Sequence, residues 1–349
     1  MQTSPVREKP RRLFQVAALL VPSLFGAIAI AALMIHQERL VVNWKTFSFQ
    51  FQEPPIYVEE PTHEVTGYRY LFDEELGWRN IPNWTASTSG RRLTINSKGL
   101  RDHEYPYEKP PGKKRVLVLG DSYTWGYGVE NDAIFTEVLE RLLEKDGKPW
   151  EVLNSGVSGY GTDQEYLWFK REGVKYQPDL VVVAFFVLND PNNNIGSIQY
   201  SLGKPVFLDT NLTRIQPPVL NPGKMREEVP GLSPLDMSVS LLHAIQRTCA
   251  EIGARLLVMK FGFHGTPPDA GNAAFDSAFK AGVTAISDTL YFDLDAECEN
   301  RNLSFYKMIE GNDDGHWNAY GHKLVGEMLH DFLDKNADQL MPQQQLNSP

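Results

Sequence analysis

The sequence is short of cysteines and of clustered basic residues, and these shortages exclude several classes of protein. Only two cysteines occur in 349 residues. The chain is therefore not a disulfide-held mini-domain, and the two cysteines lack the spacing of a metal site. We expect Cys249 and Cys298 to be buried free thiols, with a disulfide between them as the alternative. Beyond residue 12 the only basic cluster is 113–115, and the net charge is -10. A nucleic-acid partner is not expected.

A long uncharged run near the N-terminus is the clearest signal outside the main domain. Residues 13–35 contain 23 uncharged residues, directly after the basic segment 1–12. At ~1.5 Å per residue, this run spans a bilayer core of ~30 Å. Because a positive flank stays in the cytoplasm, we expect a cytoplasmic tail at 1–12 and a transmembrane helix at 13–35. The rest would then lie in the periplasm or at the cell surface. A signal peptide cleaved within 27–31 is the alternative.

The remaining chain divides by composition. Residues 36–66 are polar and marked by prolines, which indicates a stalk, and the aromatic-rich residues 67–112 indicate a small N-terminal subdomain. Residues 113–340 alternate between strand and helix patterns. This alternation predicts a three-layer α/β/α sandwich with a mostly parallel sheet. Residues 190–231, rich in Asn and Pro, form an insertion that interrupts the alternation and is long enough for a functional lid.

Local patterns place the elements of the main domain. Apolar runs predict strands at 115–119, 151–153, 180–188, 255–261 and 291–294. Helical spacing and end signals predict helices at 133–145, 162–172, 233–253 and 319–335. Thr162, with Glu165 three residues later, has the pattern of a capping box.

Polar residues with complementary chemistry follow the predicted strands. Ser122 follows the first strand, residues 154–159 follow the second and Asn189 follows the third, while His316 comes near the C-terminus. Because the carboxyl ends of parallel strands meet at one sheet edge, we expect these residues to converge. A serine nucleophile needs a histidine base, an orienting carboxylate and donors for the oxyanion. The Gly-x-Ser-x-Gly turn of α/β-hydrolases is absent.

Together these segments resemble the sequence blocks of the SGNH/GDSL hydrolase superfamily. Gly120-Asp121-Ser122 resembles the first block, 154–159 the second and Asn189-Asp190 the third, although Val187 stands where the family often has Gly. The resemblance implies Ser122 as nucleophile and His316 as base. It also implies an oxyanion hole made by the Ser122 amide, the Gly159 amide and the Asn189 side chain, with Gly156 as the second choice for the glycine.

The acid that would orient His316 has two candidates. Much of the family places it three residues before the histidine, which is Asp313. A branch that includes alginate O-acetylating enzymes places it two residues before, which is Asp314. The sequence of residues 314–318, Asp-Gly-His-Trp-Asn, resembles that branch and favours Asp314. We expect His322 to face solvent, and neither a metal nor another cofactor is expected.

The resemblance implies a serine esterase that acts on ester bonds through an acyl-enzyme. O-acetyl groups of a cell-envelope glycan suit the predicted location, so an acylated carbohydrate or another small ester is the expected partner, together with the membrane. Two alternatives stay open. One is an O-acyltransferase that uses the same residues, and the other is a non-catalytic glycan-binding or assembly protein with an SGNH fold.

Overall fold

The computed structural model of the chain divides into two compact units, Met1–Pro55 and Ile56–Pro349. The residues it describes are 40–43, 48–51, 56–57, 69–88, 91–200, 202–219, 231–265, 269–312 and 315–340. The first unit contributes one antiparallel pair, β1 (Leu40–Asn43) and β2 (Ser48–Phe51). The predicted cytoplasmic tail 1–12 and transmembrane helix 13–35 lie outside the described residues. Within those residues, no helix combines the length and apolar character needed to cross a membrane.

The second unit is built on a five-stranded sheet in which every strand pairing is parallel. The order from edge to edge is β16, β15, β10, β8, β9. The strands span Lys114–Gly120 (β8), Trp150–Asn154 (β9), Leu180–Phe186 (β10), Arg255–Phe261 (β15) and Thr289–Asp293 (β16). The chain runs from β8 to its neighbour β9, then crosses to β10 on the other side of β8. Strand order therefore reverses at β8, and ligands of open α/β sheets bind at such a reversal.

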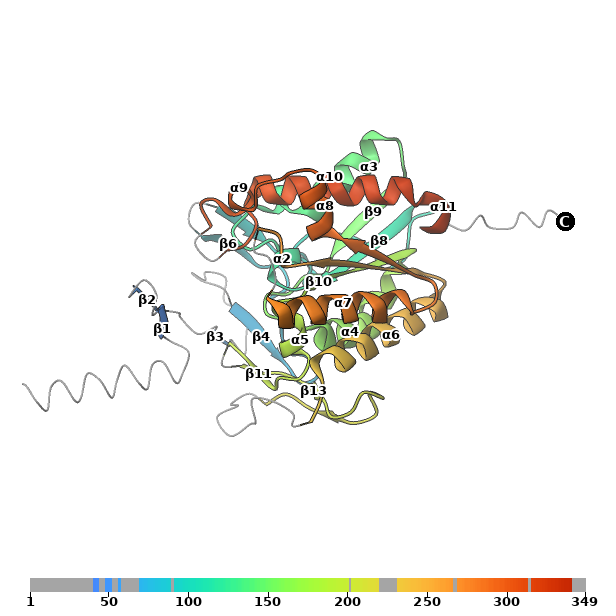
Figure 1. The fold of residues 1–349 in the computed structure, drawn as a ribbon. Helices are drawn as coiled ribbons and strands as arrows, with labels where there is room; N and C mark the ends of the chain where they lie inside the picture. Colours follow the sequence, from blue (N-terminus) through green and yellow to red (C-terminus); the bar gives the residue numbers. More distant parts are fainter. Residues whose placement is uncertain are drawn as a thin grey trace, which may run out of the picture. The chain divides into compact units, whose positions relative to one another are not determined.

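Helices cover both faces of this sheet (Figure 1). α4, α6 and α7 pack on one face around Leu117 and Val183, and α3 and α10 pack on the other around Val118 and Leu257. Successive residues of a strand point to opposite faces, so β8 contributes to both cores. The predicted three-layer sandwich is confirmed. The helices are α2 (Ser122–Trp125), α3 (Phe135–Lys145), α4 (Thr162–Arg171), α5 (Asp190–Asn193), α6 (Pro234–Ile252), α7 (Ala270–Thr284), α8 (Leu294–Asn300), α9 (Phe305–Ile309), α10 (Ala319–Lys335) and α11 (Ala337–Leu340), with 3-10 turns at Asn131–Ala133 and Gly173–Tyr176.

The segment before the sheet forms short strands, and part of this segment packs on the turn after β8. These strands are β3 (Ile56–Tyr57), β4 (Arg69–Asp73), β5 (Gly77–Asn80), β6 (Thr85–Thr88) and β7 (Arg91–Thr94). A small core joins Ile81, Trp84 and Leu93 of this segment to Trp125 of α2. The segment thus supports the turn that carries Ser122. The stalk at 36–66 and the division into a subdomain 67–112 and a main domain 113–340 stay predictions.

The predicted insertion at 190–231 contains α5 and two small antiparallel pairs in its described part. The pairs join β11 (Ile198–Gln199) to β12 (Leu202–Gly203) and β13 (Val206–Phe207) to β14 (Ile215–Gln216). Lys204, which is fully buried, forms an ion pair with Asp163 of α4 and donates to the Asn193 carbonyl at 2.7 Å. A buried ion pair therefore ties the insertion to α4.

The start of α4 differs from the predicted capping box. Gly161, not Thr162, is the N-cap, and the Gln164 side chain accepts a hydrogen bond from the Gly161 amide at 3.3 Å. Glu165, the predicted partner of Thr162, is buried instead. The box prediction was wrong because the helix begins at Thr162 itself, one residue earlier than it would if Thr162 were the cap.

The disulfide alternative is also excluded. Cys249 and Cys298 are both free and buried. Cys249 belongs to the core on one face of the sheet and Cys298 to the core on the other. The sheet lies between the two thiols, so they cannot pair.

Candidate active site

The turn after β8 presents Ser122 at the carboxyl edge of the sheet. Asp121 caps α2, because its Oδ1 accepts a hydrogen bond from the Tyr123 amide at 2.9 Å. Gly120 permits this tight passage from strand to helix, since a Cβ there would lie 2.1 Å from Thr124 Oγ1. The Gly-Asp-Ser sequence therefore sets Ser122 at the first position of a short helix.

His316 lies beside Ser122 although 194 positions separate them in the chain. Ser122 Oγ and His316 Nε2 are 2.7 Å apart, which is hydrogen-bond distance. His316 belongs to the loop before α10. Asn312 in this loop donates from Nδ2 to the His316 carbonyl at 3.2 Å and to the Trp317 carbonyl at 3.0 Å. The structure thus brings together the two residues that the sequence predicts as nucleophile and base.

Aromatic rings pack against the imidazole of His316. The ring centroids of Tyr123 and Tyr127 each lie 4.7 Å from that of His316, with interplanar angles of 33° and 36°. Tyr123 also donates from its hydroxyl to the Gly315 carbonyl at 3.1 Å and contacts the Trp317 ring. We call Tyr123, Tyr127 and Trp317 the aromatic flank. Its rings limit the rotation of the imidazole, and their π faces favour a cation over them.

The two candidate acids, Asp313 and Asp314, lie outside the described residues. They directly precede Gly315 and His316 in the chain. The choice between them therefore stays a prediction.

The end of β9 packs against α2 through Asn154. Asn154 donates from Nδ2 to the Thr124 carbonyl at 2.8 Å, and its Oδ1 accepts from the Gly156 amide at 2.9 Å. The Gly156 amide is therefore engaged inside the loop. Gly159 has φ +81°, and a Cβ there would lie 2.2 Å from the Tyr200 ring. The structure makes glycine necessary at 159 for both conformation and space.

Asn189 follows β10 and reaches the carboxylate beside Ser122. Its Nδ2 donates to Asp121 Oδ2 at 3.3 Å. Burial raises the pKa of Asp121 to about 6, against the opposing effect of the Tyr123 amide and His316. Asp121 thus holds both the helix that starts with Ser122 and the side chain of Asn189.

Further buried carboxyl groups lie beyond Asp121. Asp163, Glu165 and Asp190 are each at most 2% exposed. In the described part of the chain, both carboxylate oxygens of Glu165 lack a hydrogen-bond partner, and so does Oδ1 of Asp190. Burial raises the pKa of Glu165 well above its usual range, and the carboxylates of Asp121 and Asp163 raise it further. Burial, and after it the Glu165 carboxylate, raise the pKa of Asp190 well above its usual range. We call Asp121, Asp163, Glu165 and Asp190 the acidic flank.

Residues before the sheet also hold the site together, and the sequence did not reveal them. The buried Arg101 guanidinium donates to the Trp125 carbonyl at 2.9 Å and lies 4.4 Å from the Trp125 ring centroid. Trp78 donates from Nε1 to the Ser158 carbonyl at 3.1 Å. These residues brace the turn of Ser122 and the loop of Gly159. The supporting role of Arg101 and Trp78 is visible only from their hydrogen bonds to Trp125 and Ser158, which lie far along the chain.

His322 does not face solvent as predicted. Its side chain is 1% exposed, stacks on Phe135 and accepts from the Phe135 amide at Nδ1, at 3.3 Å. Burial lowers the pKa of His322 to about 3, so the ring is neutral at ordinary pH. The prediction was wrong because α3 covers the first turn of α10 on this side.

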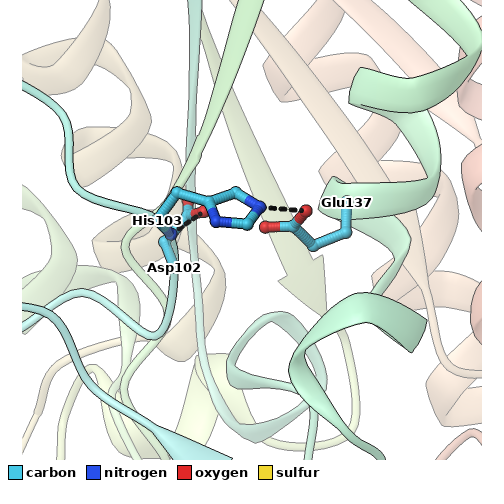
Figure 2. Close-up of side chains that lie close together, drawn as sticks. All are labelled: Asp102, His103 and Glu137. Carbon is cyan, nitrogen blue, oxygen red and sulfur yellow. Dashed lines mark hydrogen bonds and ion pairs between the residues drawn. The ribbon is translucent and has the colours of Figure 1, made fainter.

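Two groups of potential metal-ligating side chains lie elsewhere in the described chain. One is Asp102, His103 and Glu137, and the other is Asp146, His330 and Asp334. Figure 2 shows the His103 ring pointing toward Glu137, with Nε2 and Oε2 3.1 Å apart. Asp102 is already bonded, because its Oδ2 accepts from the Asn154 amide at 2.6 Å and its Oδ1 from the His103 amide. Asp102 therefore anchors the end of β9.

The parallel five-stranded sheet between two helical layers is an α/β fold of the SGNH hydrolase type. The sequence profile of the GDSL-like Lipase/Acylhydrolase family matches residues 118–324, more than half of the chain. The chain therefore belongs to this family. The match includes Ser122, Gly159, Asn189 and His316.

Solved structures give weaker similarity. The psychrotrophic esterase EstA from Pseudoalteromonas sp. matches with 16% identity over 64% of this chain and 99% of that one, with a TM-score of 0.43. An acetyl xylan esterase, AlAXEase, matches with 14% identity, 63% and 99% coverage and a TM-score of 0.42. TesA matches with 15% identity, 64% and 99% coverage and a TM-score of 0.40. A comparison with curated proteins found no match.

Proposed function

We propose that this chain is a serine esterase in which Ser122 attacks the carbonyl carbon of an ester. The observation that carries the proposal is the 2.7 Å separation between Ser122 Oγ and His316 Nε2. A serine hydroxyl becomes an effective nucleophile when an adjacent base accepts its proton. His316 has this role in the proposal, and Asp314 orients its ring, with Asp313 as the alternative acid.

The reaction proceeds in two balanced steps. Ser122 Oγ bonds to the carbonyl carbon while its proton moves to His316 Nε2. The C–O bond of the ester then breaks, and the alcohol leaves with that proton. Water repeats the sequence on the acyl-enzyme, which releases the acid and restores the Ser122 hydroxyl.

The oxyanion of each tetrahedral intermediate needs hydrogen-bond donors already in place. The proposed donors are the backbone amides of Ser122 and Gly159 and the Asn189 side chain. Gly159 is preferred to Gly156, since the Gly156 amide already donates to Asn154 Oδ1. The Asp121 carboxylate supports the Asn189 assignment, because it accepts from Nδ2 and fixes the amide next to Ser122.

The proposed substrates are O-acetyl groups of a cell-envelope glycan. Family membership supports an ester substrate, and the glycan and the site outside the cytoplasm rest on the sequence pattern of residues 1–35. An O-acyltransferase would use the same acyl-enzyme and replace water with a sugar hydroxyl.

The test uses the purified full-length chain with p-nitrophenyl acetate and acetylated oligosaccharides. We expect release of acetate from both, and loss of at least ~10⁴-fold of kcat in Ser122→Ala. An added glycan acceptor separates the alternatives: free acetate marks a hydrolase, and an acetylated acceptor marks a transferase. Absence of turnover with every ester and acceptor would favour the non-catalytic binding protein.

A further inference from the structure

Asp102, His103 and Glu137 form a cluster between the segment before the sheet and α3. One ligand atom from each residue lies within 4.8 Å of the ligand atoms of the other two. Figure 2 shows the Glu137 carboxylate pointing toward the His103 ring, with Oε2 and Nε2 3.1 Å apart. His103 and Glu137 are 34 positions apart in the chain, so no short motif of the sequence indicates this cluster.

The Glu137 carboxylate is buried and has little that compensates its charge. Glu137 is 7% exposed, and the neighbouring Asp102 is 6% exposed. In the described part of the chain no amide donates to the Glu137 carboxylate, and His103 is the single basic group within ion-pair distance of it. Two buried carboxylates at this separation repel each other, and buried charges are unfavourable unless they are paired. A cation between the two carboxylates would remove both costs.

The second group of potential metal ligands, Asp146, His330 and Asp334, differs in charge and in burial. Lys148 already forms ion pairs there, with Asp146 at 3.8 Å and with Asp334. Asp146 and Asp334 are also exposed, so water and salt screen their charges. This second group therefore needs no further cation, and it provides an internal control for the first.

The donor set of the buried cluster suits a zinc ion. Zn²⁺ binds imidazole nitrogens and carboxylate oxygens, and three protein ligands are commonly completed by a water in a tetrahedron. Bonds of about 2.0–2.1 Å place neighbouring ligand atoms of such a tetrahedron about 3.3 Å apart, which is close to the 3.1 Å between His103 and Glu137. Ca²⁺ takes six to eight oxygen ligands and Mg²⁺ prefers an octahedron of oxygens, so neither ion fits this set.

Asp102 is held in place for such a role. Its Oδ2 accepts a hydrogen bond from the Asn154 amide at 2.6 Å, and its Oδ1 accepts one from the His103 amide at 2.7 Å. A carboxylate oxygen has two lone pairs, so one of them stays available to a metal, and outer hydrogen bonds of this kind orient metal ligands. The His103 side chain is 71% exposed, so an ion can reach the cluster from solvent.

We propose that Asp102, His103 and Glu137 bind one Zn²⁺ ion, with water as the fourth ligand, and that the ion fastens the segment before the sheet to α3. Asp102 also holds the end of β9 through the Asn154 amide, so the ion ties three parts of the fold together. None of the three ligands belongs to the proposed catalytic residues, and no step of the proposed ester hydrolysis passes through the ion. The inference therefore does not depend on the proposed function.

The test titrates Zn²⁺ into the full-length chain by calorimetry, after treatment with EDTA and dialysis. We expect one ion per chain. His103→Gln and Glu137→Gln should each lower the affinity by at least ~100-fold, because loss of an outer hydrogen-bond partner alone lowers it by about 10- to 100-fold. Free Zn²⁺ at about 100 times Kd should raise the melting temperature of the wild type by about 5 °C and leave that of His103→Gln unchanged. Ca²⁺ and Mg²⁺ should have neither effect.

Matched variants separate the site from general damage and from binding elsewhere. Because the His103 side chain is exposed, the metal-free melting temperature of His103→Gln should equal that of the wild type. His330→Gln removes the histidine of the second group and should keep the full affinity. The proposal is overturned if the wild type binds no Zn²⁺, if His103→Gln and Glu137→Gln keep its affinity, or if His330→Gln abolishes binding.

Discussion

The two flanks of Ser122 are built from opposite chemistry. On the aromatic flank, Tyr123 and Tyr127 pack their rings at 4.7 Å from His316. On the acidic flank, Asn189 is bonded to Asp121, and two more carboxyl groups with unpartnered oxygens, Glu165 and Asp190, are buried in the same region.

The difference concerns the charge that each flank tolerates. Aromatic rings can pack against the imidazole whether it is charged or neutral. Their π faces stabilise a cation without forming strong bonds to it. Buried carboxyl groups without partners disfavour the charged form. Glu165 and Asp190, whose pKa values are raised well above their usual range, are therefore expected to be neutral. Asp121 and Asp163 differ, because the Tyr123 amide and Asn189 donate to Asp121 and Lys204 pairs with Asp163.

The largest effect is expected from the donor next to the acidic flank. Asn189→Ala should lower kcat by about 10²–10³-fold with little change in KM, because an oxyanion donor acts mainly in the transition state. Steady-state kinetics with p-nitrophenyl acetate measures kcat and KM of the variant and the wild type. Asn192→Ala, at an exposed position of α5, is the control. A loss of only a few-fold would remove Asn189 from the oxyanion hole.

A smaller effect is expected on the aromatic flank. Tyr127→Leu should lower kcat by roughly 2- to 30-fold, which corresponds to about 0.5–2 kcal/mol of cation–π stabilisation. Tyr127→Phe should keep most of the activity, since it keeps the ring. Tyr306→Leu on the exposed face of α9 should change nothing. Equal losses in the Leu and Phe variants would show that the hydroxyl matters and not the π face.

The smallest effect is a change of stability on the acidic flank. Because the folded-state pKa of Glu165 is raised, its protonated form favours folding at low pH. That contribution is lost as pH rises from the unfolded value of about 4.3 through the folded pKa. Glu165→Gln stays neutral, so its melting temperature should match the wild type near pH 5 and exceed it increasingly toward pH 8.

Thermal melts across this range measure the difference, at about 2–4 °C per kcal/mol for a domain of this size. Glu144→Gln, at an exposed position of α3, should show a flat difference. A Glu165→Gln protein that is less stable at pH 8 than the wild type would mean that the Glu165 carboxylate is charged and bonded.

The sequence predicted the sheet well because its strands are continuous apolar runs. β15 and α10 match their predicted bounds, and β8 differs by one residue at each end. α7 escaped prediction, since only Phe279 and Val283 of its side chains are buried and the apolar period is weak. Its position follows from the sheet that it covers and not from its own sequence.

The pairing of Ser122 with His316 was predictable because each lies in a recognisable block at a strand or helix end. The supports of the site were not. Arg101 and Trp78 act on residues 24 and 80 positions away, and the acidic flank collects side chains from α4, α5 and the N-cap of α2. Such contacts depend on how separate helices and strands pack together, and no local sequence pattern indicates that packing.

The most direct test of the Ser122–His316 pair is the mass of the chain after reaction with a fluorophosphonate. We expect one adduct, mapped by peptide analysis to Ser122, that is absent in Ser122→Ala and forms far more slowly in His316→Ala. An adduct on a different serine, or unchanged labelling of Ser122→Ala, would contradict the assignment of the nucleophile.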